Sequence, residues 1–437
     1  MSLKTKIKAC LPASILNIIY LLRKLISNFS KYINYNYVIP YKHQRTLQKL
    51  KKKETIRCVF LLLDENIWKY DGLYRLMQKD SNFEPIILVC PIVNYGYDNM
   101  IYKMNNCYNY YKNRGYHVIL SYNKTSDIYV DLRKDLNPDI IFYTNPYKGL
   151  IDDRFYVDKF PDILSVYVPY SAQEAIPSEA GYNLDSHNRF WRYYAVSPYH
   201  KKYSKQLAYN RGRNVIVTGY PQFELFIDKN YMPSNNCWKE FNSSKKRIIW
   251  APHHTLQAAG VVNYSTFLKY ADFMLDMADK YKDKVQWVFK PHPHLYNKLC
   301  KLWGKDKAAE YYDKWKNKSN TSFIDSGYVD LFLTSDAMIH DSGSFVVEYL
   351  YVNKPVLRPL NEIPLNVLYN DYGLDCLNNY YLAKSQIDIE QFIRMIIAEE
   401  DPLKEKRTQF ITKTLLPQGS KLPSELILED IISNFRK

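Results

Sequence analysis

Glycine is scarce in this sequence, with 13 copies in 437 residues, whereas tyrosine alone occurs 42 times. This composition excludes glycine-rich repeats and low-complexity structure. Two glycine-containing nucleotide motifs, the Walker A sequence and the G-x-G-x-x-G fingerprint, do not occur, which disfavours ATP hydrolysis and NAD chemistry. RNP-like, helix-turn-helix and zinc-finger patterns are also missing, so no nucleic-acid partner is expected.

Paired cysteines and long hydrophobic runs are lacking as well. The seven cysteines are dispersed and form no C-x-x-C pair, a usage typical of a reducing compartment. The uncharged run near the N-terminus, residues 9–22, is interrupted by Arg23 and Lys24, well short of the ~20 apolar residues that a membrane-spanning helix needs. Because the sequence also shows no secretory signal, we expect a cytoplasmic protein.

Positive charge is in excess, with a formal net charge of +15 and a pI near 9.1. This charge favours an anionic membrane face or an anionic substrate. Residues 1–55 predict basic amphipathic helices that bind peripherally to the inner face of the cell membrane; a helix packed on its own protein is the alternative. The residues behind this prediction are the basic Lys4, Lys6, Lys8, Arg23 and Lys24, the apolar Leu11, Ile15, Ile18, Ile19, Leu22 and Ile26, and the aromatic Tyr20, Phe29 and Tyr32.

From Ile56 onward, apolar β-branched runs alternate with helical patterns, which is typical of parallel sheets with crossover helices. We therefore predict an α/β protein with two doubly wound Rossmann-type domains facing a cleft. The expected divisions are an acceptor-side domain over 56–228, a polar linker over 229–246, a nucleotide-binding domain over 247–400 and C-terminal helices over 401–437. The strands are expected at 57–63, 85–90, 117–120, 139–143, 164–168, 193–196, 214–218, 247–250, 285–289, 322–324, 337–339 and 356–357.

The segment Ser335–Pro355, SDAMIHDSGSFVVEYLYVNKP, predicts a buried strand, a turn of hydroxyl side chains with one glycine, and a helix. The start of a helix offers free N–H groups and a positive dipole end, which suit a phosphate group. Glu348 follows Ser344 by four residues, about 6 Å further along the same helix face. That distance matches a ribose diol attached to a diphosphate. The segment therefore favours a nucleotide diphosphate. The alternative is an ordinary helix N-cap before an acidic helix, which has the same sequence pattern and binds no ligand.

Five of the nine histidines follow predicted strands of the second domain. They belong to three segments: Trp250–Thr255 (WAPHHT), Lys290–His294 (KPHPH) and His340. Because ligands bind at the carboxyl ends of parallel strands, these imidazoles indicate a phosphate site or an acid/base site. Zinc is a competing interpretation, but no H-E-x-x-H or Cys/His spacing supports it. We expect neither a metal nor another cofactor.

Two loops of the first domain are expected to face the same cleft. Residues 168–174 (VPYSAQE) and 217–222 (VTGYPQ) each follow a predicted strand. They lie where a substrate would enter from the first domain, although each could equally be a simple proline-containing turn.

The ordered motifs GYPQ (219–222), WAPHHT (250–255), KPHP (290–293), SDAMIHDSGSFVVEY (335–349) and KPV (354–356) resemble those of the CDP-glycerol glycerophosphotransferases. This family of teichoic-acid polymerases, primases and related capsule enzymes has the GT-B fold. The resemblance covers residues 56–359. It implies a membrane-associated bacterial cell-envelope enzyme that moves glycerol or ribitol phosphate from a CDP-polyol to a polyanionic polymer or its lipid-linked primer and releases CMP.

The resemblance also assigns roles to residues. His292 matches the family's His-Pro histidine near the diphosphate, Ser342, Gly343 and Ser344 match the phosphate-binding turn, and Glu348 matches the ribose contact. The aromatic-His-Gly-Thr-Pro segment, whose histidine is the family's favoured base, is here VPYSAQEAIP and contains no histidine. The family's basic residue after the Ala-Pro-Thr strand is likewise replaced, by His253 and His254.

The predicted reaction is therefore direct phosphoryl transfer, which needs positioning and charge neutralisation more than covalent chemistry. The base is expected among Glu174, His253 and His254, with the histidines preferred because an unperturbed imidazole has a pKa of about 6.5. The substrate-binding residues are expected to be Lys290, His292, His294, His340, Asp341, Ser342, Gly343, Ser344, Glu348 and Arg358.

Two alternatives remain open. A GT-B glycosyltransferase or epimerase that uses a UDP- or CMP-sugar could carry a similar nucleotide-binding turn. A membrane-surface scaffold without enzyme activity would explain the charge but not the histidines at the strand ends.

Overall fold

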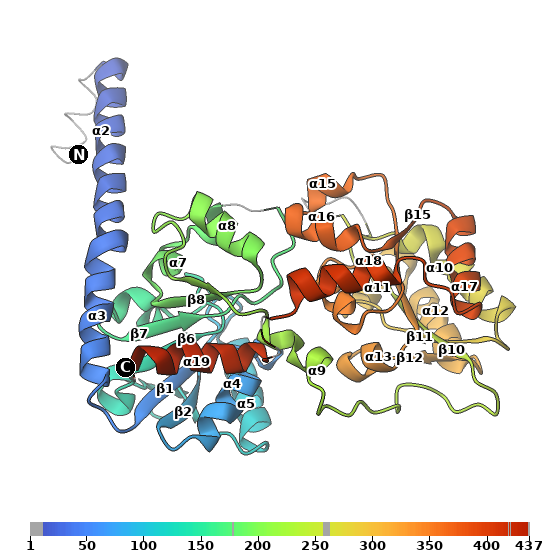
Figure 1. Cartoon of the computed structure of the whole chain (residues 1–437), viewed down its shortest axis with the longest axis horizontal. Helices are drawn as coiled ribbons and strands as arrows, with labels where there is room; N and C mark the ends of the chain where they lie inside the picture. Colours follow the sequence, from blue (N-terminus) through green and yellow to red (C-terminus); the bar gives the residue numbers. More distant parts are fainter. Residues whose placement is uncertain (1–11, 177–178, 257–262, 418, 420, 436–437) are drawn as a thin grey trace.

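The computed structural model describes residues 12–176, 179–256, 263–417, 419 and 421–435. It contains two α/β domains, each built on a parallel sheet, joined by residues 228–245, which form neither helix nor strand (Figure 1). A long N-terminal helical segment precedes the first domain. It consists of α2 (Ala13–Ile33), the π-helical turn η1 (Asn34–Val38) and α3 (Ile39–Leu50).

The N-terminal domain has a seven-stranded sheet in the order β3-β2-β1-β6-β7-β8-β9. Alternate residues of the central strand β1 enter separate buried clusters, with Phe60 in one and Val59 in the other, so the sheet is covered on both faces. The strands are β1 (Ile56–Leu62), β2 (Phe83–Val89), β3 (Val118–Leu120), β6 (Ile140–Tyr143), β7 (Leu164–Tyr167), β8 (Arg192–Ala195) and β9 (Val215–Val217). The helices are α4 (Asp71–Lys79), α5 (Tyr97–Lys112), α6 (Glu179–Tyr182), α7 (Asp185–Arg189), α8 (Pro198–Leu207) and α9 (Glu224–Ile227).

The C-terminal domain has a six-stranded parallel sheet in the order β12-β11-β10-β13-β14-β15. Its core also divides between two faces, since Ile249 and Trp250 enter different clusters. The strands are β10 (Lys246–Ala251), β11 (Val285–Phe289), β12 (Thr321–Phe323), β13 (Ala337–His340), β14 (Val356–Pro359) and β15 (Tyr381–Ala383). The helices are α10 (Phe267–Lys280), α11 (Leu295–Trp303), α12 (Lys305–Asn317), α13 (Val329–Thr334), α14 (Phe345–Glu348), α15 (Leu365–Leu368), α16 (Asp371–Leu377), α17 (Gln386–Ile397) and α18 (Lys404–Phe410).

The predicted fold class is confirmed: both sheets are parallel and wound by helices. Three strands were not predicted. They are β15 and the antiparallel pair β4 (Tyr122–Asn123) and β5 (Ile128–Tyr129), which are too short to show a periodic pattern. The helix expected after Ser344 is only one α-helical turn, α14, continued by the 3₁₀ segment η7 (Tyr349–Val352). Lys4, Lys6, Lys8 and Leu11, which belong to the predicted basic extension, lie outside the described residues.

The C-terminal helix α19 (Pro423–Phe435) returns to the N-terminal domain and packs against α4 (Figure 1). Its Asp430 carboxylate accepts hydrogen bonds from Arg192 Nε at 2.7 Å and from the Tyr194 hydroxyl at 2.8 Å. At the start of α19, the backbone N–H of Ser424 donates to Glu224. The chain therefore passes between the two domains twice.

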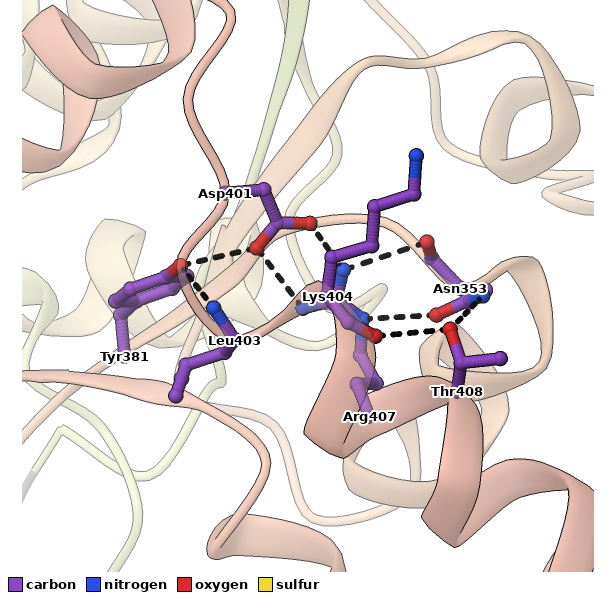
Figure 2. Close-up of polar contacts among 7 residues, drawn as sticks. All are labelled: Asn353, Tyr381, Asp401, Leu403, Lys404, Arg407 and Thr408. Carbon is purple, nitrogen blue, oxygen red and sulfur yellow. Dashed lines mark hydrogen bonds and ion pairs between the residues drawn. The ribbon is translucent and has the colours of Figure 1, made fainter.

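Before this return, α18 is fixed to the C-terminal domain by Arg407, whose side chain is fully buried. Figure 2 shows the guanidinium donating to the Asp401 carboxylate and to both oxygens of Asn353, which has a left-handed φ of 52° at the end of η7. Asp401 also accepts from the Tyr381 hydroxyl at 2.9 Å. The cluster thus ties α18 to β15 and to the segment that follows the predicted phosphate turn.

We expect Arg407→Met to destabilise the C-terminal domain, because it leaves the Asp401 carboxylate without its charged partner; removing one member of a buried ion pair typically costs about 3–5 kcal/mol. The thermal midpoint should fall by several degrees. Lys404→Met, an exposed position on the same helix, is the matched control and should leave the midpoint unchanged. Equal midpoints for the two variants would show that the cluster does not stabilise the fold.

Candidate active site

The loops that follow β11, β10 and β13 lie side by side because these strands are neighbours in the sheet. Residues 290–294, 252–255 and 341–344 are therefore brought together, although they are far apart in the sequence. The backbone N–H of His292 donates to the Pro252 carbonyl at 3.0 Å, which joins the first two loops directly.

Four of the five predicted histidines form one cluster. The ring centroids of His254 and His292 are 4.1 Å apart, those of His253 and His254 are 4.3 Å apart, and those of His253 and His292 are 5.0 Å apart. His294 lies at the exposed margin, 5.3 Å from His292. His340 is separate.

Hydrogen bonds set the tautomers of two of these rings. The backbone N–H of His294 donates to His292 Nδ1 at 3.1 Å, so the proton of the neutral ring is on Nε2. Thr255 Oγ1 accepts from the N–H groups of Tyr264 and Ser265, which directs its own hydrogen to His253 Nδ1, 3.1 Å away. Each of His253 and His292 therefore carries an Nε2–H group that donates to no other described residue.

His253 and His292 are uncharged at neutral pH. Burial, reinforced by neighbouring imidazoles, lowers the pKa of both His253 and His292 to about 3. Burial also lowers the pKa of His254. The expectation that these histidines have an ordinary pKa, which made them the preferred bases, is therefore wrong. A neutral N–H donor with so low a pKa suits anion binding and makes a weak general base.

The ligand atoms of His253, His254 and His292 lie within 4.8 Å of one another, which is compatible with metal binding. The donor set fits a cation poorly, however. A metal needs lone pairs, whereas the hydrogen bonds place protons on Nε2 of His253 and His292. The surrounding charges of Arg358 and Lys298 are also positive. The arrangement suits a phosphate oxygen better than a divalent ion.

Three residues predicted to contact substrate instead lie beneath the turn and support it. The His340 ring is 1% exposed and lies 3.1 Å from the Tyr380 hydroxyl. Asp341 is 2% exposed and accepts from the backbone N–H groups of His253 and Thr266 and from the Thr266 hydroxyl. Arg358 is also buried and donates to the Ser342 carbonyl at 3.0 Å. The sequence placed these residues at strand ends, but it could not show that their side chains point into the core.

The turn itself, residues 342–344, lies against the N-terminal domain. A Cβ atom added at Gly343 would lie 3.0 Å from the Tyr264 ring and 3.4 Å from Glu174 Oε1. A side chain at this position would press against the Tyr264 ring, so close packing favours glycine. Ser344 is exposed and its hydroxyl lies 3.5 Å from that of Ser342, so both hydroxyls are at the same side of the turn.

Glu174 comes from the loop after β7 of the N-terminal domain. Its carboxyl is buried and lies beside the turn at Gly343. Its Oε2 is buried and has no hydrogen-bond partner among the described residues. Burial raises the pKa of Glu174. A desolvated carboxyl of this kind is a stronger base than an exposed one once it is ionised.

Glu348 is the second buried carboxyl at the junction. Burial and the nearby charge of Glu174 raise its pKa to about 8, while a hydrogen bond with Tyr328 and the charge of Lys290 act in the opposite direction. Lys290 is itself buried, which lowers its pKa. Tyr264 and Tyr328, which line this junction, were not singled out from the sequence, because nothing distinguishes them among 42 tyrosines.

Two Rossmann-type domains, with phosphate-suited donors and a buried carboxyl at their junction, are the arrangement of a GT-B-type fold with a site suited to a nucleotide. Residues 169–363 match the family described as CDP-Glycerol:Poly(glycerophosphate) glycerophosphotransferase. The matched segment contains the Glu174 loop, the histidine cluster and the turn at 342–344. The family resemblance predicted from the motifs is confirmed over this segment.

Solved structures share the fold at low identity. A variant of the wall teichoic acid polymerase TagF is 15% identical, with a TM-score of 0.53 over 94% of this chain and 99% of that chain. A TagF variant crystal soaked with CDPG gives 14% identity and a TM-score of 0.54 over the same shares. A putative UDP-N-acetylglucosamine 2-epimerase from Listeria monocytogenes is 13% identical, with a TM-score of 0.54 over 87% and 97%. Comparison with the curated proteins gives no match.

The raised pKa of Glu348 predicts a pH-dependent stability. The folded protein retains the proton of this carboxyl up to about pH 8, whereas an unfolded glutamate releases it near pH 4.3. Stability should therefore fall as the pH rises from about 5 to 8. Glu348→Gln should be more stable than the parent at pH 8 and similar to it at pH 4.

Thermal midpoints measured between pH 4 and pH 8 test this expectation. Glu362→Gln, at an exposed position, removes the same charge and should reproduce the parental pH dependence. A parallel pH dependence for Glu348→Gln and the parent would refute the assignment of a raised pKa to Glu348.

Proposed function

We propose that this protein transfers a polyol phosphate from a CDP-polyol to a hydroxyl of a cell-surface polymer or of its lipid-linked primer and releases CMP. The family match supports the class of reaction. The observation that carries the proposal is the meeting of Glu174 with the turn at Gly343, because it places a desolvated carboxyl from one domain beside phosphate-suited donors of the other.

The donor diphosphate would be bound by the C-terminal domain. Ser342 and Ser344 offer hydroxyl donors, and His253 and His292 offer Nε2–H groups. Neutral imidazole donors can hold a phosphate oxygen without adding like charges to an already basic surface. Lys290 supplies a buried positive charge near Glu348, the proposed contact of the ribose diol.

In the proposed reaction, the acceptor hydroxyl oxygen attacks the phosphorus that carries the polyol. A new P–O bond forms, the bond from that phosphorus to the bridging oxygen breaks, and CMP leaves with the electron pair. Glu174 takes the proton of the hydroxyl. The net positive charge of the protein suits a polyanionic acceptor, since electrostatic attraction raises the local concentration of such a substrate.

Incubating the purified protein with separate CDP-polyols and nucleotide sugars, in the presence of a polyol-phosphate acceptor, tests this function. CMP should appear only in the reactions that contain a CDP-polyol, and not in those that contain a nucleotide sugar. Parallel reactions with CDP-glycerol and CDP-ribitol identify the polyol. Glu174→Gln should lower kcat about 100-fold or more, as expected for loss of a general base. Glu240→Gln, in the exposed linker, should retain full turnover.

Consumption of a UDP- or CMP-sugar without CMP release from any CDP-polyol would refute the proposed reaction and favour a glycosyltransferase or an epimerase. Unchanged kcat in Glu174→Gln would refute the base assignment alone.

We further propose that α2 binds the inner face of the cell membrane peripherally. Figure 1 shows α2 extending beyond both domains. Ile18, Leu22, Leu25 and Phe29 recur at helical spacing and are 52–67% exposed, an apolar stripe that is costly to leave in water. Among the residues that the structure describes, no helix is both long and apolar enough to cross a bilayer.

Substituting Leu25→Glu should weaken binding to vesicles that contain anionic phospholipid by about 10-fold or more, because burying one leucine contributes about 1.5–3 kcal/mol. Ser27→Glu adds the same charge on the opposite side of the helix and should have a smaller effect. Co-sedimentation measures the binding, and CMP release with a soluble acceptor should be the same for both variants. If both variants lost vesicle binding equally, repulsion between the added carboxylate and the anionic lipid would explain the loss, and insertion of the apolar stripe would not.

A further inference from the structure

Asn370 joins the two domains at the Glu174 loop. It belongs to the C-terminal domain, immediately before α16, and is 4% exposed. Its Nδ2 donates to the carbonyl of Gln173 at 2.8 Å and to that of Ala175 at 2.6 Å. Its backbone N–H donates to the carbonyl of Glu174 at 3.0 Å. One residue of the second domain thus holds three consecutive carbonyls of the first.

The held loop is tightly constrained. Gln173 has a left-handed φ of 56°, an unusual conformation for a residue with a side chain. Its side-chain oxygen accepts from the Tyr193 hydroxyl at 2.9 Å, and Ala175 forms a β-bridge with Tyr369. A Cβ atom added at Gly373 would lie 2.7 Å from the Glu174 carbonyl, so the backbones are in direct contact. Such strain persists only where the surroundings fix it.

The orientation of Glu174 depends on this backbone contact. Its buried Oε2 has no hydrogen-bond partner among the described residues. Since Oε2 is not held by a partner and the carboxyl also interacts with the backbone of Glu174 itself, its position depends largely on the main chain that carries it. The loop carbonyls and their donors on Asn370 therefore determine where the carboxyl lies relative to Gly343.

The Asn370 side chain has a second task on the same helix. Its Oδ1 accepts from the backbone N–H of Gly373 at 2.9 Å and caps the start of α16. Asp and Ser can also provide this cap, but only the amide combines the cap with two N–H donors directed at the loop. The two tasks can therefore be separated by substitution.

We propose that Asn370 is a positioning residue for the transfer reaction: it fixes the Glu174 carboxyl against the phosphate-suited turn and makes assembly of the active site depend on contact between the domains. This inference rests on the proposed role of Glu174. Asn370 lies after the segment that matches the family model, 169–363, and it touches no reacting group itself.

Asn370→Asp and Asn370→Ser test the inference because both retain the helix cap and lose the paired N–H donors. We expect kcat for CMP release to fall about 10- to 100-fold, with the KM for the CDP-polyol within about threefold of the parent. Asn378→Asp introduces the same charge at an exposed position at the end of α16 and should retain full kcat. The thermal midpoint should keep the parental value in Asn378→Asp and fall by only a few degrees in the two Asn370 variants, which leave buried loop carbonyls unpaired.

The pH profile separates positioning from a general structural effect. Burial raises the pKa of Glu174, so releasing the loop to water should lower it. The acid limb of kcat/KM should move to lower pH in the uncharged variant Asn370→Ser. An unshifted limb with unchanged kcat would overturn the inference, as would a fall in the thermal midpoint that accounts for all of the lost activity.

Hydrogen exchange provides a readout that does not need turnover. In Asn370→Ser, peptides covering residues 169–176 should exchange faster, while those of α16 should keep the parental rate. If the parent releases CMP from no CDP-polyol, the proposed function fails, yet this exchange pattern would still establish the contact. Unchanged exchange in 169–176 would show that Asn370 does not hold the loop.

Discussion

The site depends on the hydrogen bonds that the buried carboxylate of Asp341 accepts. This carboxylate lies at the end of β13 and accepts from the backbone of two residues, His253 and Thr266, that border the loop after β10. Without these acceptor oxygens, buried N–H groups would remain unpaired. The same contacts hold the loop so that Thr255 can fix the His253 ring. The phosphate-suited turn and the histidine cluster are therefore one hydrogen-bonded unit.

Strand patterns in the sequence predicted most of this architecture. Because both faces of a parallel sheet are buried, its strands are almost entirely apolar, and runs such as Val285–Phe289 could be predicted as strands. Parallel strands also explain why His253 and His292 meet, since the carboxyl ends of neighbouring strands share one edge. The short strand β15 escaped prediction because Tyr381–Ala383 has one buried residue and no run.

What the sequence could not predict depends on three-dimensional surroundings. Position at a strand end did not reveal that the His340 ring points into the core, where Tyr380 covers it. An ordinary imidazole pKa was assumed for His253, but burial changes it. The bond between Asn370 and Gln173 joins residues 197 positions apart in different domains, and no local pattern encodes such a contact.

The return of α19 to the N-terminal domain has a mechanical consequence. The chain crosses between the domains along residues 228–245 and again between α18 and α19. Two domains joined by two crossings are less free to move relative to each other than two domains joined by one, because a large twist or slide would have to extend both connections. Both crossings therefore limit how far the domains can separate. Such separation would break the three hydrogen bonds between Asn370 and the Glu174 loop.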